Sequence, residues 1–256
     1  MRLVVIALLL VSTTPLGICQ PITVAAAADL SSALGEIAAN YKKATGQEVR
    51  LSFGASGSLT SQIQNGAPFD LFFSADEDYP KKLVDAGLAD GNSMYRYAIG
   101  RLVLWVPASS SLDIEHRGLR SLLDPSVTKI AMANPQHAPY GRAAEAALKH
   151  EGIYDSVATK LVLGENVSQA AQFVESGNAQ VGLIALSHAL APQRKDKGRY
   201  WQVPLADYPV LNQAVVMISK SSNKDRAQAF LEFVKSADAV SLLQHYGFSG
   251  GSETTK

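Results

Sequence analysis

Four short segments of the chain combine small residues with hydroxyl, amide or carboxyl side chains, and they contain no lysine or arginine. They are residues 26–32, 54–58, 139–141 and 166–168. Each lies between a predicted strand and a predicted helix. The first N–H groups of a helix have no acceptor within the helix and lie at the positive end of its dipole. Helix starts therefore attract anions, and small residues let the backbone approach a bound ligand closely.

Several such helix starts in one cleft would hold a dianion through neutral donors alone. Roughly four to seven charge-assisted hydrogen bonds are enough for micromolar or tighter binding. Taken singly, each segment is also compatible with ordinary helix capping, because Ser, Asp and Asn are common N-cap residues. Residues 54–58 are the exception, since a cap alone does not need two glycines and two serines. The pattern indicates an anion-binding cleft.

The elements that must position these segments alternate along the chain. Short apolar or β-rich runs predict strands at residues 22–25, 49–53, 70–73, 97–106, 129–133, 180–185 and 213–219. Apolar residues at helical spacing predict helices around residues 30–41, 59–64, 79–84, 142–150, 168–176, 227–234 and 240–246. Repeated strand–helix units predict an α/β fold with mostly parallel sheets.

Two long apolar runs, residues 97–106 and 213–219, are the candidates for strands that cross between two lobes. We expect residues 21–97 together with 220–256 to form lobe I, and residues 98–219 to form lobe II. Ligands usually bind in the cleft between such lobes.

The N-terminus has the layout of a secretory signal peptide, which we place in residues 1–20. Arg2 is followed by an apolar run at residues 3–11 and by small, turn-forming residues. We therefore expect an exported, periplasmic protein. Residues 16–19 loosely resemble a bacterial lipobox, so lipid anchoring through Cys19 is the alternative, although Ile18 stands where a small residue is expected. A single cysteine excludes a disulfide framework and a cysteine metal site.

Composition and motifs argue against other classes of protein. The chain has 23 basic and 23 acidic residues and no basic stripe, so nucleic acid is not an expected partner. None of the five histidines has the spacing of a metal site. Ser56 is not in a GxSxG motif, because Gly57 follows it directly. We predict a protein that is not an enzyme, with a hydrolase using a serine in the cleft as the lower-ranked alternative.

Two further polar features have an ordinary interpretation. His137 lies near the predicted cleft and is expected on a surface loop, with a role in the cleft as the alternative. Residues 194–197, which are rich in charge, are expected to form a solvated loop, with contact to a membrane permease as the alternative.

Several longer stretches resemble the family of periplasmic molybdate-binding proteins. They are residues 52–58, 66–76, 97–105, 134–141 and 246–248. The similarity extends over nearly the whole mature chain in the same order. It implies the type II periplasmic binding protein fold, with two α/β lobes joined by two crossover strands. It also implies capture of molybdate or tungstate by a monomer, and delivery to an ABC permease and its ATPase. Another tetrahedral oxyanion, sulfate or phosphate, is the alternative ligand.

The resemblance also implies the residues that line the site. Ser56 would donate its hydroxyl and its backbone N–H, and Ala75 would line the site at the end of the third strand. Tyr140 and Val167 would contribute backbone N–H groups from lobe II. The complete set is Ala28, Asp29, Ser56, Ala75, Tyr140 and Val167. No cofactor and no free metal cation are expected, because molybdenum would be bound as its oxyanion.

The chain departs from the family pattern at two positions. Asp29 stands where many members carry a neutral donor, and an ionised carboxylate cannot donate to a dianion and repels it. We expect Asp29 to turn away and cap the helix; the alternative is that it accepts a proton from a protonated oxyanion such as phosphate or arsenate. Ala185 stands where some members carry a ligand-binding tyrosine, and the phenol of Tyr140 is an alternative donor.

Overall fold

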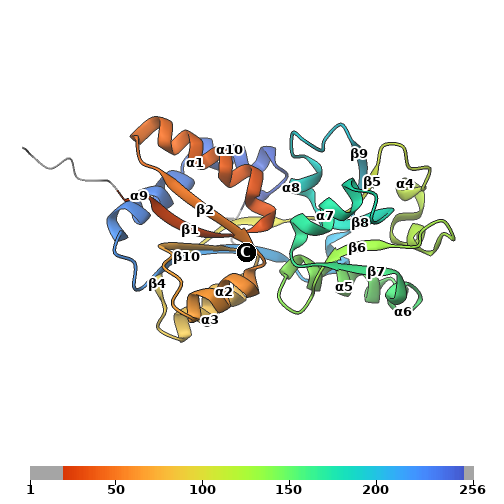
Figure 1. Ribbon diagram of the computed structural model, residues 1–256, viewed down its shortest axis with the longest axis horizontal. Coiled ribbons are helices and arrows are strands. Elements are labelled where there is room, and N and C mark those ends of the chain that lie inside the picture. The colour runs from red at the N-terminus through yellow and green to blue at the C-terminus, as the bar shows by residue number, and fades with distance from the viewer. Residues whose placement is uncertain (1–19, 251–256) are drawn as a thin grey trace, which may run out of the picture.

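The computed structural model describes residues 20–250. The predicted signal segment and Cys19 lie outside the described residues. The chain forms two α/β lobes side by side along the long axis of the molecule, each built around its own sheet (Figure 1). The two-lobed α/β architecture predicted from the sequence is confirmed. The expectation of mostly parallel sheets is wrong, because each sheet contains both parallel and antiparallel pairs of strands.

Lobe I is built around a six-stranded sheet with the order β11-β4-β10-β3-β1-β2. Strand β1 pairs in parallel with β2 and β3, whereas β10 runs antiparallel between β3 and β4. The strands are β1 Ile22–Ala27, β2 Val49–Gly54, β3 Leu71–Ser74, β4 Ala89–Gly100, β10 Leu211–Ile218 and β11 Ser249–Gly250.

Helices cover both faces of this sheet. The predicted apolar stripe of α1 is buried and packs with α9 and α10, whereas α2 and α3 pack with a separate apolar cluster that contains Phe72 and Val216. The helices are η1 Ala28–Leu30, α1 Ser31–Thr45, α2 Ser56–Gln64, α3 Asp78–Asp85, α9 Lys224–Val234 and α10 Ala237–His245.

Lobe II is built around a five-stranded sheet with the order β7-β6-β8-β5-β9, in which β6 pairs in parallel with both β7 and β8. Its strands are β5 Leu102–Pro107, β6 Ile130–Ala133, β7 Leu161–Gly164, β8 Val181–Ala185 and β9 Gly198–Gln202. Its helices are α4 Ile114–Arg117, η2 Gly118–Leu123, α5 Pro139–His150, α6 Tyr154–Val157, η3 Ala158–Lys160, α7 Val167–Glu175, α8 Leu186–Ala189 and η4 Leu205–Asp207.

The crossings between the lobes differ from the prediction. The run 97–106 is not one strand, because β4 ends at Gly100 and β5 begins at Leu102 in the other sheet. Arg101 stands between the two strands, and its carbonyl accepts from the Leu186 N–H at 2.9 Å. The last residues of β4 and nearly all of β5 are buried, so residues 97–106 form one apolar run in the sequence.

The return crossing also lies earlier than predicted. Strand β10 pairs with β3 and β4 inside the lobe I sheet, so the chain leaves lobe II before Leu211 rather than at residue 219. The boundary drawn at the end of the apolar run therefore placed a central strand of lobe I in lobe II. When a strand is buried on both faces, its residue pattern is apolar throughout and does not show to which sheet it belongs.

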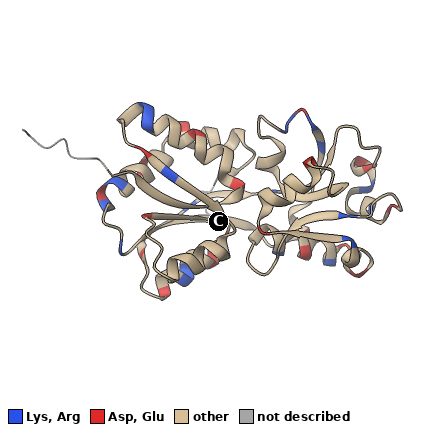
Figure 2. Cartoon of the chain, in the orientation of Figure 1, with Lys and Arg blue, Asp and Glu red and all other residues tan. Residues whose placement is uncertain are grey.

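Charged residues are spread over both lobes. In the view of Figure 2, Lys and Arg lie among Asp and Glu and form no continuous basic stripe. The expectation of a fully solvated loop at residues 194–197 is wrong for Arg194, which is buried and pairs with Glu175 at 2.9 Å. Within residues 20–250, no helix is long and apolar enough to cross a membrane.

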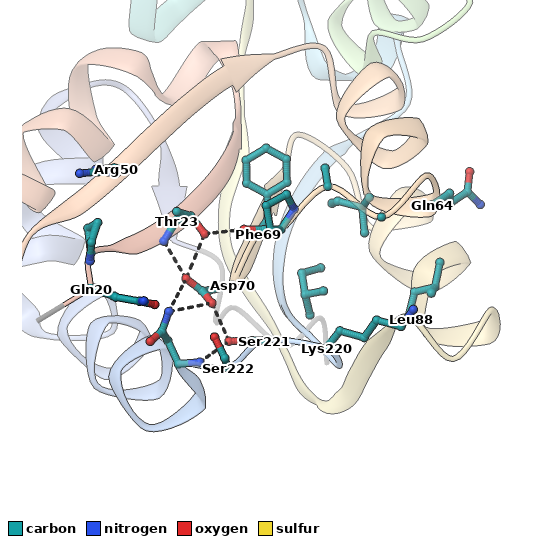
Figure 3. A pocket seen from close by; sticks show the side chains of 17 residues that line it. Gln20, Thr23, Arg50, Gln64, Phe69, Asp70, Leu88, Lys220, Ser221 and Ser222 are labelled. Atoms are coloured by element: carbon teal, nitrogen blue, oxygen red, sulfur yellow. Dashed lines mark hydrogen bonds between the residues drawn. The ribbon is translucent and has the colours of Figure 1, made fainter. Parts of the chain in front are cut away.

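A cavity of about 540 Å³ lies at the amino-terminal ends of β1 and β3, and its lining residues all belong to lobe I (Figure 3). Its main polar feature is the buried carboxylate of Asp70. This carboxylate accepts from the Thr23 N–H at 2.7 Å, from the Thr23 hydroxyl at 3.0 Å and from the Ser221 hydroxyl at 2.7 Å. Asp70 therefore ties β1 to the segment that leaves β10.

We predict that Asp70→Ala lowers the free energy of unfolding by about 2–3 kcal/mol, because it leaves the part-buried Thr23 N–H and the Ser221 hydroxyl without their acceptor, whereas the Thr23 hydroxyl keeps the Pro68 carbonyl at 2.7 Å. Urea-induced unfolding followed by circular dichroism measures the change. Asp85→Ala, at an exposed position at the end of α3, is the matched control and should change stability by less than about 0.5 kcal/mol. Equal effects of the two substitutions would contradict the structural role of Asp70.

Candidate anion-binding site

The four segments singled out in the sequence converge on one small cavity between the lobes. Its volume is about 10 Å³. All six candidate residues line it, and all six are buried. Lobe I contributes the ends of β1, β2 and β3 with the residues that follow them, and lobe II contributes the starts of α5 and α7. The lining residues are Ala27, Ala28, Asp29, Gly54, Ala55, Ser56, Ala75, Ala138, Pro139, Tyr140, Asn166 and Val167.

No lysine, arginine or histidine is among these lining residues. Positive potential at the cavity therefore comes from helix starts and backbone N–H groups. The carboxyl ends of β1, β2 and β3 face the cavity, which is the edge at which open α/β sheets bind ligands.

The two helices of lobe II that start at the cavity, α5 and α7, each have a backbone donor there. Helix α5 has no side-chain cap, and Pro139 at its start has no N–H, so the Tyr140 N–H is the first donor of the helix. At α7, the side chain of Asn166 accepts from the N–H groups of Ser168 and Gln169, at 3.0 and 3.1 Å. This cap leaves the Val167 N–H as the donor without an acceptor in its own helix.

Ser56 is held in position for donation. Its hydroxyl oxygen accepts from the Ala75 N–H at 3.0 Å, which leaves the hydroxyl hydrogen for another acceptor. Helix α2 starts at Ser56 without a side-chain cap, so the Ser56 N–H is also without an acceptor in its helix. The Ala75 N–H is thus occupied in orienting Ser56.

Asp29 does not cap a helix, and this prediction is wrong. The helix starts next to it, η1 and α1, have no side-chain cap. Instead, Oδ2 of Asp29 accepts a hydrogen bond from Nε2 of Gln213 at 2.6 Å. Gln213 is fully buried in β10, and sequence reasoning missed it. The signal was an amide side chain at the start of the apolar run 213–219, since a buried amide needs partners.

Gln213 connects Asp29 to two buried tyrosines. The Tyr97 hydroxyl donates to Oε1 of Gln213 at 2.8 Å, and Nε2 of Gln213 lies 3.3 Å from the Tyr140 hydroxyl. The phenol of Tyr140 thus points into this network. A side chain at Gly100 would collide with both Tyr140 and Gln213, so only glycine leaves room for them.

Burial raises the pKa of the Asp29 carboxyl to about 6, although hydrogen bonds from Gln213 and Tyr140 offset part of this effect. Burial also raises the pKa of Tyr97 and of Tyr140 well above the ordinary value of a tyrosine. Both tyrosines are therefore neutral at physiological pH. Oδ1 of Asp29 has no hydrogen-bond partner within the described part of the chain.

Contacts between the lobes close the cavity. The Gly57 N–H of α2 donates to the His137 carbonyl at 2.8 Å, and the Ser187 hydroxyl donates to the Asp29 carbonyl at 2.7 Å. Arg142 of α5 pairs with Asp76 of lobe I. His137 therefore lies at the lobe interface rather than on a free surface loop.

Gly57 is required by this closure. A Cβ atom there would lie 2.5 Å from the Tyr79 hydroxyl and 2.8 Å from both Cβ and the carbonyl oxygen of His137. Those distances are too short for any side chain, so a glycine at this position lets the lobes meet.

The site has no catalytic arrangement around its serine. The hydroxyl oxygen of Ser56 accepts from a backbone N–H, and no histidine lines the cavity. In residues 20–250, no group of three or more His, Cys, Asp or Glu side chains could hold a metal ion.

The chain is similar to known bacterial proteins that bind solutes. A model of the bacterial extracellular solute-binding protein family matches residues 22–249. The molybdate-binding protein ModA of Azotobacter vinelandii is 36% identical over 227 residues, which cover 89% of each chain. The ModA protein of Rhodobacter capsulatus is 37% identical over 224 residues, which cover 88% of this chain and 86% of that protein.

The solved structure of the Azotobacter vinelandii periplasmic molybdate-binding protein superposes with a TM-score of 0.84, at 35% identity. The match covers 89% of this chain and 98% of that one. It confirms the predicted type II periplasmic binding protein fold. The family consists of binding proteins for transport rather than enzymes. The chain therefore belongs to the bacterial extracellular solute-binding proteins, in the branch that contains the molybdate-binding proteins ModA.

Proposed function

We propose that the protein captures molybdate in the cleft between its lobes and delivers it to an ABC importer. The observation that carries this proposal is the convergence of uncapped helix starts on a cavity without lysine, arginine or histidine. Neutral donors suit an oxyanion that must later be released, because they bind it without a fixed counter-charge. The names of the relatives support molybdate as the ligand.

The proposed ligand contacts come from both lobes. In lobe I, the hydroxyl and N–H of Ser56 and the backbone at Ala28 and Asp29 would hold one side of the anion. In lobe II, the N–H groups of Tyr140 and Val167 would hold the other side. Ala75 orients Ser56 through the hydrogen bond of 3.0 Å. Each donor is modest alone, but bonds to charged oxygens are about twice as strong as neutral ones.

Binding and closure are linked in this mechanism. An anion contacts donors of both lobes only when the cleft is closed, so it shifts the equilibrium by its differential affinity for that form. The contacts of Gly57 with His137 and of Arg142 with Asp76 then hold the two faces together. The closed form would dock on the permease.

Membership of the family implies an extracytoplasmic, periplasmic protein that works with a membrane permease and its ATPase. We further propose that residues 1–20 are a signal peptide, with lipid attachment at Cys19 as the alternative, and that the protein is a monomer. We also propose that tungstate binds at the same site as molybdate, since both are tetrahedral dianions.

We predict that calorimetric titration of residues 21–256 detects tight binding of molybdate and tungstate, and no binding of sulfate or phosphate under the same conditions. The measurement uses the four anions one after another at a single pH. Binding of sulfate or phosphate alone would replace molybdate as the ligand. Absence of heat with all four anions would contradict an oxyanion function.

We predict that Ser56→Ala weakens molybdate binding by about 1–3 kcal/mol, roughly 5- to 150-fold, because a hydrogen bond to a charged oxygen is lost. Calorimetry measures the change. Ser222→Ala, at an exposed position outside the cavity lining, should bind as tightly as the native protein. An unchanged affinity of Ser56→Ala would remove Ser56 from the site.

We predict that Gly57→Ala weakens binding of molybdate by about 1–3 kcal/mol, the range for an overpacked contact, because the new methyl group keeps the lobes apart. Small-angle X-ray scattering with saturating molybdate should then show a more open molecule than the native protein. Gly35→Ala on α1, where a Cβ meets no atom within 4 Å, is the matched control. Full closure and native affinity of Gly57→Ala would contradict this role of the glycine.

A further inference from the structure

The carboxyl of Asp29 is the one acidic side chain that lines the anion cavity. It is only 1% exposed. Its two oxygens differ, because Oδ2 accepts from Gln213 whereas Oδ1 has no partner in the described residues. None of the ion pairs formed by residues 20–250 includes Asp29. A carboxyl at an anion site without a counter-ion needs an explanation.

A dianion and an ionised carboxylate cannot share this cavity without strong repulsion. No lysine, arginine or histidine lines the cavity, and charges interact more strongly in a buried site than in water. The carboxyl cannot turn away, because Gln213 holds Oδ2 and the Ser187 hydroxyl holds the main-chain carbonyl of the same residue. Neutralisation by a proton is the remaining response.

The groups that face Asp29 from the surrounding elements cannot supply a compensating charge. They are Tyr97 of β4, Tyr140 of α5, Gln213 of β10 and Ser187 of α8, and all are neutral. Asp76 is the other acidic group that raises the pKa of Tyr97, and it is paired with Arg142. The proton must therefore reside on Asp29 itself or on the ligand.

We propose that Asp29 binds the oxyanion as a neutral carboxylic acid, so that capture of one dianion takes up one proton from solvent. The inference rests on the proposed function of the cavity. Oδ2 remains an acceptor for Gln213, and the proton is placed on Oδ1, the oxygen without a partner. Protonation turns an acceptor that repels the anion into a donor that binds it.

The proton is available near neutral pH. Burial raises the pKa of Asp29 to about 6 even though hydrogen bonds from Gln213 and Tyr140 lower it, and a dianion beside the carboxyl would raise that pKa further. The sign of the pH dependence follows. Below about pH 6 the free protein already carries the proton, so affinity is constant; above it, affinity should fall about tenfold per pH unit.

This proton also makes Asp29 a residue that determines specificity. A neutral carboxyl favours anions that are fully deprotonated, because it offers them a donor. An ionised carboxyl favours an anion that carries its own proton, such as hydrogen phosphate, because it offers an acceptor. The two ligand classes therefore respond to pH in opposite directions.

The test is calorimetry of the protein with molybdate between about pH 6.5 and 8.5, in pairs of buffers with different ionisation enthalpies. The difference in heat between two buffers gives the number of protons taken up. We expect about one proton per anion near pH 8, together with the tenfold loss of affinity per pH unit. Binding without proton uptake and with constant affinity would overturn the inference, whereas no binding at any pH would overturn the proposed function instead.

Substitution of the carboxyl provides the second arm. Asp29→Asn offers a neutral donor that cannot titrate, so its affinity should be independent of pH and about 10- to 100-fold tighter than native at pH 8. Its proton uptake should be zero. Asp70→Asn is the control, a buried carboxyl of lobe I outside the cavity lining and outside the contacts between the lobes, and should retain an uptake of about one. Loss of uptake in Asp70→Asn alone would overturn the assignment to Asp29.

The measurement on the native protein does not depend on either variant. If Asp29→Asn fails to fold, the buffer pairs still count protons in the native protein, and a count of zero there contradicts the proposal.

Discussion

The structure depends on one electrostatic constraint. The cleft must take a doubly charged anion out of water, although no lysine, arginine or histidine lines it. Backbone N–H groups at helix starts meet this constraint, because they carry partial positive charge in fixed directions. They must come from several helices, since one helix start offers too few donors. The parallel strands of both lobes supply such helices, with their carboxyl ends directed at the same cavity.

Close approach of backbones is the second consequence of the same constraint. Donors on two lobes reach one small anion only if no side chains stand between them. Gly57 allows α2 to meet the His137 carbonyl, and Gly100 leaves room for Tyr140 and Gln213. These glycines have negative φ, so they are required for space rather than for backbone conformation. The same few positions therefore determine the packing between the lobes and the placement of the helix starts at the anion site.

The sequence predicted the loops of the site and the strands and helices next to them, because these depend on neighbouring residues. Strands β7 and β9 and the short helices α4, α6 and α8 were not predicted. The cavity brought together every segment that the pattern of small residues had indicated. Contacts between distant residues were not predictable in this way. Gln213 lies 184 residues from Asp29, and Arg194 pairs with Glu175 from 19 residues away. The membership of β10 in lobe I was missed for the same reason, since the strands that pair with β10 are distant in the sequence.

The contacts of Asp29 explain why its carboxyl should change its charge, rather than its position, when an anion binds. Its network joins Tyr97 near the end of β4 to Gln213 near the start of β10, the two strands that adjoin the crossings between lobes. Tyr140 adds lobe II to the same network. Movement of the carboxyl away from an anion would therefore disturb both crossings and the lobe contact together. Transfer of one proton leaves all of these contacts in place, so protonation is the smaller perturbation.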